Sequence, residues 1–212
     1  MLDHSVVVFD FDGTLVDSNH IKIKGFYDVI EPSEAQRNLM SSILDSNSGD
    51  RSQIFLEFLT RLQQDENIDL QGEVEFLVAK YSNHVDDMVI DAPEIEGAID
   101  LLRFLKQKKI KIILSSATPE SNLKKIINRK GWDFYFDDIF GAPRSKNDTL
   151  LHVLKKYSIS NRDIFVVGDG IDDRRSAESI RCDFIPVGGI ELKPYELTSY
   201  SLAGVKSYIK IN

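Results

Sequence analysis

The sequence predicts an α/β fold, in which a Rossmann-like parallel sheet is flanked by helices and carries an inserted all-helical cap domain. The apolar run 6–9 ends directly in acidic residues, as a buried strand does where it reaches a ligand crevice. From about residue 92 onward, apolar runs alternate with helical patterns, which is typical of parallel strands joined by helices. Between these parts, residues 17–91 show a helical pattern without a convincing strand.

These patterns divide the chain into a core, residues 1–16 and 92–212, and a cap, residues 17–91. In the cap, Pro32 is expected to end a first helix, and Ser33 is a plausible N-cap for the second. Two further cap helices are expected where apolar residues recur at three- and four-residue steps, over 54–62 and 74–81.

The core is expected to resume with a helix through residue 105, with Pro93 in its first turn, where its missing N–H would have no helical partner. Strands and helices then alternate along the chain. The expected strands cover 110–114, a short segment within 134–140, 164–167 and 184–187. The expected helices cover 119–130, 146–157, 172–180 and 202–209.

The composition weighs against several classes of protein. A formal net charge of −8 disfavours nucleic acid and anionic membranes as partners, because both require a basic face. No apolar run approaches the length of a membrane-spanning helix, and the acidic residues near the N-terminus leave no signal-peptide pattern. The single cysteine, Cys182, excludes an internal disulfide and fits a cytoplasmic location. A monomer and a homodimer are both compatible with the sequence.

The first candidate motif follows the run 6–9 and reads Asp-Phe-Asp-Gly-Thr-Leu-Val-Asp-Ser. Its first two carboxylates, Asp10 and Asp12, lie where the carboxyl end of a strand opens onto a ligand crevice. A metal ion would relieve their paired negative charge. The alternative is a strand followed by an acidic turn.

Two further segments place polar side chains where the core is expected to bind an anion. Ser115 and Ser116 close a buried strand just before a helix, although helix capping explains them equally well. Lys146 begins a later helix, where its charge opposes the helix dipole and favours a compensating anion. Arg144 is the alternative basic residue, and a lone lysine is most often a surface residue.

A fourth segment reads Val-Val-Gly-Asp-Gly-Ile-Asp-Asp and again ends a buried strand in acid. The preference of acidic residues for helix N-termini explains Asp172 and Asp173. It does not explain Asp169, which stands directly at the end of the strand. The segment therefore favours a second acidic contribution to the same crevice.

The four motifs, in this order, resemble those of the haloacid dehalogenase-like phosphatases. The helical insertion resembles the helical-cap subgroup, which includes phosphoglycolate phosphatase-like and β-phosphoglucomutase-like enzymes. The resemblance implies that Asp10 is the nucleophile and Asp12 the general acid–base. It also implies that Ser115, with Ser116, binds the transferring phosphoryl group, and that Lys146 neutralises the nucleophile and holds phosphate oxygens.

The same resemblance implies one Mg²⁺ ion bound by Asp10, Asp169 and the backbone carbonyl of Asp12, with Asp173 acting through a water molecule. Two positions depart from the family pattern. Relatives often carry proline where this chain has Asn147, and asparagine where it has Asp172.

The activity implied is a Mg²⁺-dependent phosphatase that hydrolyses a small phosphorylated metabolite through an aspartyl-phosphate. Asp12 favours ester hydrolysis, because dehalogenases and phosphonate-cleaving relatives lack an acid there. One alternative is a sugar phosphomutase, although Lys22 replaces the usual hinge histidine. The other is a catalytically silent phosphometabolite-binding protein. In the cap, the segment 47–51 corresponds to the family's substrate loop, so Arg51 is either a ligand for an anionic substrate tail or a solvated arginine at a helix start.

Overall fold

The computed structural model describes residues 5–46, 50–62, 69–188 and 201–206. The chain divides into two compact units. We call residues 1–18 with 92–212 the core unit, and residues 19–91 the helical unit. The α/β fold predicted from the sequence is confirmed, and each unit is described by itself.

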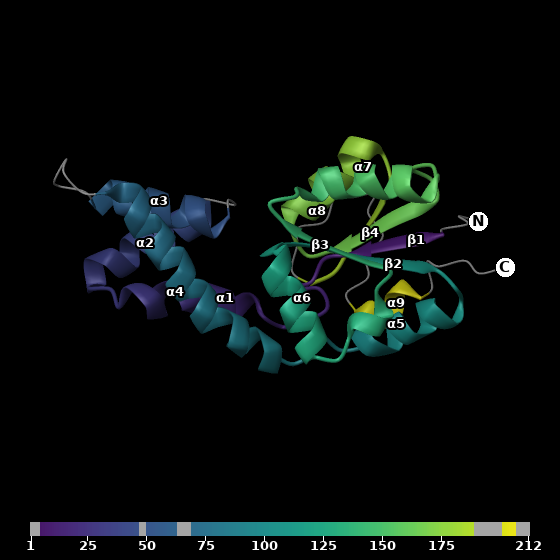
Figure 1. Ribbon diagram of the computed structural model, residues 1–212, viewed down its shortest axis with the longest axis horizontal. Coiled ribbons are helices and arrows are strands. Elements are labelled where there is room, and N and C mark those ends of the chain that lie inside the picture. The colour runs from purple at the N-terminus through teal and green to yellow at the C-terminus, as the bar shows by residue number, and fades with distance from the viewer. Residues whose placement is uncertain (1–4, 47–49, 63–68, 189–200, 207–212) are drawn as a thin grey trace. The chain divides into compact units, whose positions relative to one another are not determined.

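The core unit is built on a parallel sheet with the strand order β3-β2-β1-β4-β5 (Figure 1). The strands are β1 (Val6–Phe9), β2 (Lys111–Pro119), β3 (Asp138–Ala142), β4 (Ile164–Gly168) and β5 (Asp183–Pro186). The central strand β1 is buried along its whole length. Burial on both faces explains why its sequence is a continuous apolar run rather than an alternating one.

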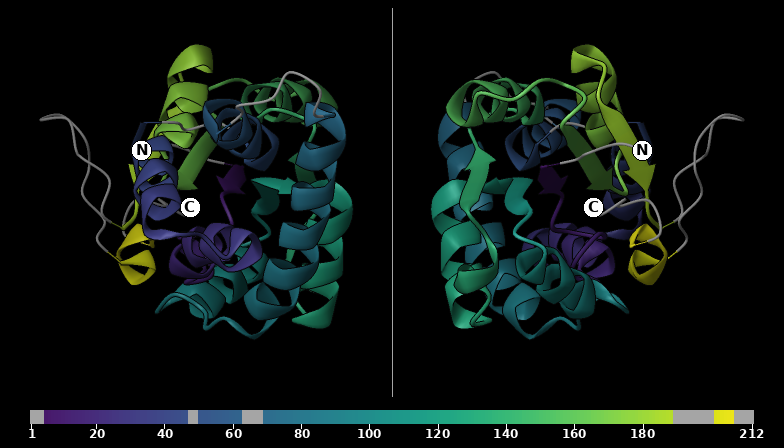
Figure 2. Two further views of the ribbon diagram at one scale, coloured as in Figure 1. Left: turned by 90° about the vertical axis from the view of Figure 1, so that its left-hand side faces the viewer. Right: turned by 90° about the vertical axis from the view of Figure 1, so that its right-hand side faces the viewer.

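Helices cover both faces of this sheet, as Figures 1 and 2 show. One face carries α5 (Ala98–Gln107) and α6 (Glu120–Arg129), and the short α9 (Leu202–Val205) packs against α5. The opposite face carries α7 (Lys146–Tyr157) and α8 (Ile171–Ile180). Apolar side chains of β1, β2 and β4 pack against α7 and α8 and fix these two helices beside the ends of the strands.

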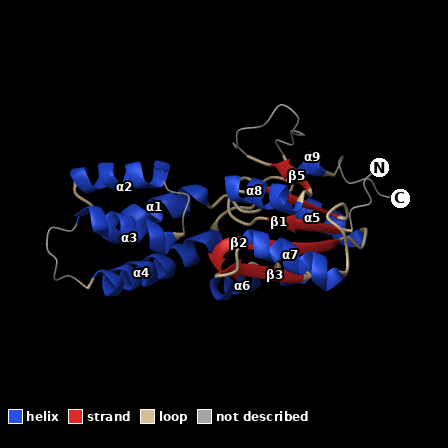
Figure 3. Cartoon of the chain, turned by 90° about the horizontal axis from the view of Figure 1, so that it is seen from above, coloured by secondary structure: helices blue, strands red, loops and turns tan. Residues whose placement is uncertain are grey.

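The helical unit contains helices but no strand among its described residues (Figure 3). Its helices are α1 (Asn19–Ile30), α2 (Glu34–Ser46), α3 (Arg51–Leu62) and α4 (Leu70–Asp91). The aromatic rings of Phe26, Phe55 and Tyr81 meet at its centre, with centroids 4.5–6.0 Å apart. A Cβ atom at Gly25 would lie 2.3 Å from Val85 Cγ2, so α1 and α4 approach this closely only because residue 25 is glycine.

The predicted cap at the start of α2 is confirmed. The Gln36 backbone N–H donates to Ser33 Oγ at 3.4 Å, and the Ser33 N–H donates to Gln36 Oε1 at 2.9 Å. This reciprocal pair is a capping box, which gives two backbone donors a partner at the helix N-terminus.

The prediction that Pro93 lies in the first turn of a helix is wrong. Helix α5 begins at Ala98, after Gly97 with φ of 86°. Pro93 instead accepts a hydrogen bond at its carbonyl from the Asp17 N–H at 2.9 Å, and the Ile95 N–H donates to the Leu15 carbonyl at 3.0 Å. The segment returning to the core therefore pairs with the segment leaving β1, and this pairing outweighs the local helix signal.

The strand predicted within 134–140 lies later than expected. A 3₁₀ turn covers Asp133–Tyr135, and β3 then covers 138–142 because its register with β2 begins at Ile113 and Asp138. Strand β2 continues past the predicted residue 114 to Pro119. The last predicted helix, 202–209, is described only to residue 206, and α9 ends at Val205. No helix in the described ranges is both long enough and apolar enough for a membrane span.

Candidate active site

The strand order brings the carboxyl ends of β1, β2 and β4 side by side. From β1 the chain adds β2 and β3 on one side, and β4 and β5 on the other. This reversal is the topological switch point at which open α/β sheets bind their ligands. Asp10 continues β1 toward β4, since its N–H donates to the Val167 carbonyl at 2.9 Å.

Three carboxylates converge at this point. Asp10, Asp169 and Asp173 each offer an oxygen atom, and these oxygens lie within 4.8 Å of one another. Asp173 approaches closely because Gly168 has no side chain, since a Cβ atom at residue 168 would lie 2.4 Å from Asp173 Cγ. The Gly170 N–H also donates to Asp173 Oδ2 at 3.2 Å. An all-oxygen donor set of this kind fits a hard divalent cation.

Lys146 lies against these carboxylates. Its Nζ atom is 3.3 Å from Asp10 Oδ1, 2.9 Å from Asp172 Oδ2 and 2.8 Å from Asp173 Oδ1, and its side chain is 11% exposed. The N-cap Ser145 fixes the start of α7, because its Oγ accepts from the Asp148 N–H at 3.0 Å. Helix capping therefore positions the lysine.

Burial and close charges shift the pKa values of these side chains. Burial raises the pKa of Asp10 well above its usual value, Lys146 opposes this, and the neighbouring aspartates add to the rise. Burial likewise raises the pKa of Asp173 to about 6, against the pull of Lys146. Burial opposes the charge on Lys146, but Asp10, Asp173 and Asp172 more than compensate and raise its pKa. A cation among these carboxylates would favour their charged forms.

Asp12 is held by a shell of hydroxyl groups. Ser18 Oγ donates to its Oδ1 at 2.7 Å, while Ser116 Oγ and Thr118 Oγ1 donate to its Oδ2 at 3.3 and 3.1 Å. The carboxylate is buried, and these hydroxyls come from the segment after β1 and from the end of β2. These hydrogen bonds orient the Asp12 carboxylate.

A sequence model described as haloacid dehalogenase-like hydrolase matches residues 7–187. The chain belongs to this family. A phosphoglycolate phosphatase from Psychrobacter arcticus is 24% identical over 198 residues, which cover 86% of this chain and 82% of that protein.

Solved structures share the fold of this family member. A predicted phosphoglycolate phosphatase from Haemophilus somnus superposes with a TM-score of 0.79 at 18% identity, covering 99% of this chain and 100% of the other. CbbY from Rhodobacter sphaeroides, solved as a mutant in complex with xylulose-(1,5)bisphosphate, gives 0.74 at 15% identity, covering 94% and 95%.

The two adjacent serines of this hydrolase-family chain point to different surroundings, as neighbours in a strand do. Ser116 contacts Asp12, whereas Ser115 lines a cavity of about 10 Å³ together with Lys146 and Asp173. Arg144, the alternative basic residue, lies over the Phe140 ring at 4.9 Å and is exposed. The lysine, not this arginine, is the basic residue beside Asp10.

Sequence reasoning missed several hydroxyl groups that position the acids. Thr14 Oγ1 donates to Asp169 Oδ1 at 3.1 Å and is fully buried. Ser18 and Thr118 were likewise not predicted as partners of Asp12. Their proximity to the motifs was a usable signal, but the pairing itself depends on which strands are neighbours.

Arg51, at the start of α3, contacts α4 within the helical unit. Its Nη1 donates to Ser82 Oγ at 2.7 Å, and its guanidinium lies over the Tyr81 ring at 4.9 Å. The predicted substrate-loop residues 47–49 lie outside the described part of the chain. The role predicted for Arg51 is taken up below as a proposal.

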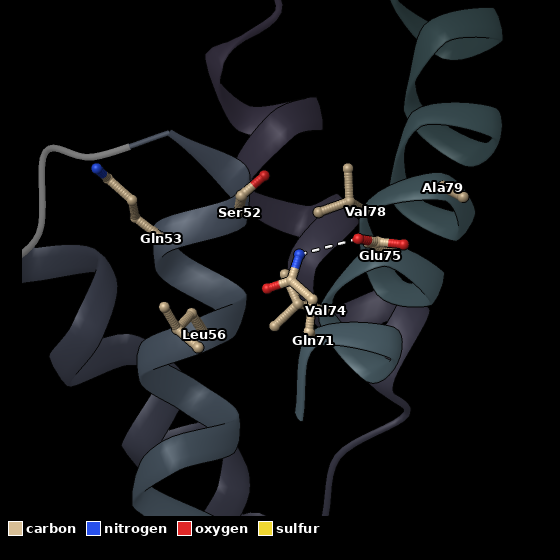
Figure 4. A pocket seen from close by; sticks show the side chains of 8 residues that line it. All are labelled: Ser52, Gln53, Leu56, Gln71, Val74, Glu75, Val78 and Ala79. Carbon is tan, nitrogen blue, oxygen red and sulfur yellow. Dashed lines mark hydrogen bonds between the residues drawn. The ribbon is translucent and has the colours of Figure 1, made fainter. Parts of the chain in front are cut away.

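A larger cavity of about 310 Å³ lies between α3 and α4 in the helical unit (Figure 4). Leu56, Val74 and Val78 give it an apolar character, and Gln71 Nε2 donates to Glu75 Oε1 at 2.9 Å across part of its lining. Glu75 is the one ionisable side chain in this lining, so the cavity has no paired acid and base. The candidate active site is therefore the carboxylate cluster at the strand ends of the core unit.

Proposed function

We propose that this protein is a Mg²⁺-dependent phosphatase that hydrolyses a small-molecule phosphate monoester through an aspartyl-phosphate on Asp10. The observation that carries the proposal is the placement of Asp10, which shares an oxygen cluster with Asp169 and Asp173 and lies 3.3 Å from Lys146. The phosphoglycolate phosphatase relative supports the same reaction class.

In this proposal Asp10 and Asp169 hold the cation, together with the backbone carbonyl of Asp12, and Asp173 acts from close by. Magnesium suits these ligands, because it takes oxygen donors and keeps several waters that a phosphate oxygen can replace. When bound, the ion neutralises phosphate charge that would otherwise repel the Asp10 carboxylate.

The remaining steps belong to side chains of this chain. A carboxylate oxygen of Asp10 forms a bond to phosphorus as the ester oxygen leaves, and Asp12 gives that oxygen its proton. Asp12 then accepts a proton from the water that attacks the phosphorus, which releases phosphate and restores Asp10. Lys146 stabilises the negative charge on the phosphoryl oxygens during both transfers. Ser115 and Ser116 remain the candidate hydroxyl ligands of the phosphoryl group.

The helical unit serves as the cap in this proposal, and Arg51 is its candidate ligand for an anionic substrate tail. An Arg51→Ala variant is expected to raise KM for substrates that carry a second anionic group, but not for uncharged esters. Arg61, an exposed arginine on the same helix, provides the matched Arg61→Ala control. The proposed setting is the cytoplasm, with a small phosphorylated metabolite as the partner.

The proposal is tested by a phosphate-release screen over sugar phosphates, phosphoglycolate and nucleoside monophosphates. Wild-type protein is expected to release phosphate from at least one of them with Mg²⁺ and to stop when the metal is chelated. Product analysis separates the alternative, because a phosphomutase moves the phosphoryl group without releasing it. Metal-dependent ligand binding without turnover of any substrate would contradict the proposal and favour a silent binding protein.

A further inference from the structure

Lys146 is surrounded by more carboxylates than its proposed task requires. Asp10, Asp172 and Asp173 all lie within 3.3 Å of its Nζ atom. An ammonium group has three N–H donors, so three carboxylate partners can engage all of them. An incoming phosphate oxygen can then reach Lys146 only if one carboxylate gives way.

Two of these carboxylates are poorly suited to leave. Asp173 is 2% exposed and is also held by the Gly170 N–H. Asp10 is 8% exposed, and moving either group away from Lys146 would leave a buried charge without its partner.

Asp172 differs from them, because its side chain is 54% exposed. An exposed ion pair contributes little free energy, since water solvates the separated charges well. Gly170 leaves room for the present arrangement, as a Cβ atom there would lie 2.4 Å from Asp172 Oδ1. Asp172 can thus fold back onto Lys146 or turn out to water at low cost.

We propose that Asp172 is a positioning residue that occupies the phosphate-facing donor of Lys146 in the empty site and yields it to the phosphoryl group of the substrate. This inference rests on the proposed function and adds to it a means of tuning affinity. Asp172 competes with every phosphate that binds, so it weakens the binding of substrate and of product phosphate alike.

A purely structural role makes a different prediction. Asp172 lies in the first turn of α8, where a negative charge stabilises the helix dipole. If that were its whole contribution, neutralising it would lower the free energy of unfolding but leave phosphate affinity unchanged.

The test measures binding of inorganic phosphate by calorimetry at saturating Mg²⁺ for wild type, Asp172→Asn and Asp172→Glu. Asp172→Asn is expected to lower the Kd about fivefold, the size of an exposed ion pair. Asp172→Glu keeps the charge and is expected to restore weak binding. In turnover assays, KM should fall with the Kd in Asp172→Asn while kcat does not rise. Glu178→Gln, at another exposed position of the same helix, is the matched control for net charge.

An unchanged or weaker phosphate affinity in Asp172→Asn would overturn the inference, and so would an equal gain in Glu178→Gln. Failure of the proposed function looks different. A wild-type protein that turns over no monoester, yet whose Asp172→Asn variant binds inorganic phosphate more tightly, would leave the competition at Lys146 intact and refute only the catalytic proposal.

Discussion

The core unit and the helical unit bury different kinds of side chain. Among the described residues, the core unit buries carboxylates and hydroxyls at the ends of its strands, such as Asp10, Asp12 and Thr14. In the described part of the helical unit, the buried side chains are apolar or aromatic except for Asp86. Burying a polar group costs folding free energy unless the group is paired. The concentration of such groups in the core unit therefore indicates that the functional site lies there. Substitutions in the two units should therefore fail in different ways.

The largest expected effect is loss of turnover without loss of fold. Asp10→Asn removes the proposed nucleophile and should lower kcat on the order of 10⁴-fold or more, as for other nucleophile replacements. Steady-state kinetics measure the loss, and circular dichroism checks that the fold is retained. Asp133→Asn, which neutralises an exposed acid in the 3₁₀ turn, should keep wild-type turnover. Wild-type turnover in the Asp10→Asn variant would show that Asp10 is not the nucleophile.

In the helical unit we expect a substitution to lower stability without changing the metal site of the core unit. Phe55 is fully buried and packs beside Phe26 and Tyr81, so Phe55→Ala should lower the free energy of unfolding by about 3–5 kcal/mol. Denaturant unfolding measures this loss. Binding of Mg²⁺ below the unfolding transition should be unchanged, because the proposed ligands lie in the core unit. A large loss of Mg²⁺ affinity would show that the helical unit contributes to the metal site, contrary to the difference drawn between the units.

A smaller effect on turnover is expected for one of two buried threonines of the core unit, of which only Thr118 contacts Asp12. Thr118→Val removes a hydrogen bond to Asp12. The activation free energy should rise by about 1–3 kcal/mol, so kcat should fall roughly fivefold to a hundredfold. Thr149→Val is the matched control, because Thr149 is equally buried and donates to the Ser145 carbonyl at 3.0 Å. Both variants should lose stability, but only Thr118→Val should lose turnover. Equal kinetic losses would show that orientation of Asp12 is unimportant.

The smallest effect concerns pH and stability away from the site. Burial raises the pKa of Asp137, but hydrogen bonds from Lys111, the Ile112 N–H and Lys106 outweigh it and hold the pKa below its usual value. A lowered carboxyl pKa stabilises the fold above the unfolded pKa of about 3.9, and this stability is lost as pH falls through the folded value.

Asp137→Asn should therefore cost about 1 kcal/mol of unfolding free energy near pH 7 and progressively less below pH 4. Denaturant melts at several pH values measure the difference. The exposed Asp133→Asn variant should show little change across the same range. A cost for Asp137→Asn that does not shrink in acid would indicate that packing, rather than charge, holds β2 and β3 together here.

The comparison also shows what the sequence could predict. The fold class and the strand ends that carry Asp10 and Asp169 follow from local patterns, and so does Lys146 at a helix start. Strand β2, in contrast, continues past Ser115 and Ser116 to Pro119. Errors arose where distant segments pair, as when residues 93–95 join the segment leaving β1 instead of starting a helix.

The candidate site shows the same limit. The acidic motifs could be recognised singly, but the hydroxyl shell of Asp12 depends on Ser18 and Thr118 meeting across neighbouring segments. The contact of Asp172 with Lys146 likewise depends on how α7 and α8 pack. Such partners are set by topology and register, which local sequence patterns do not specify.

The most direct measurement is a crystal structure of the protein grown with Mg²⁺ and inorganic phosphate. The account predicts one Mg²⁺ ion touching Asp10 and Asp169, with phosphate oxygens on the ion and on Lys146. A metal ion bound elsewhere, or phosphate without contact to Lys146, would contradict it.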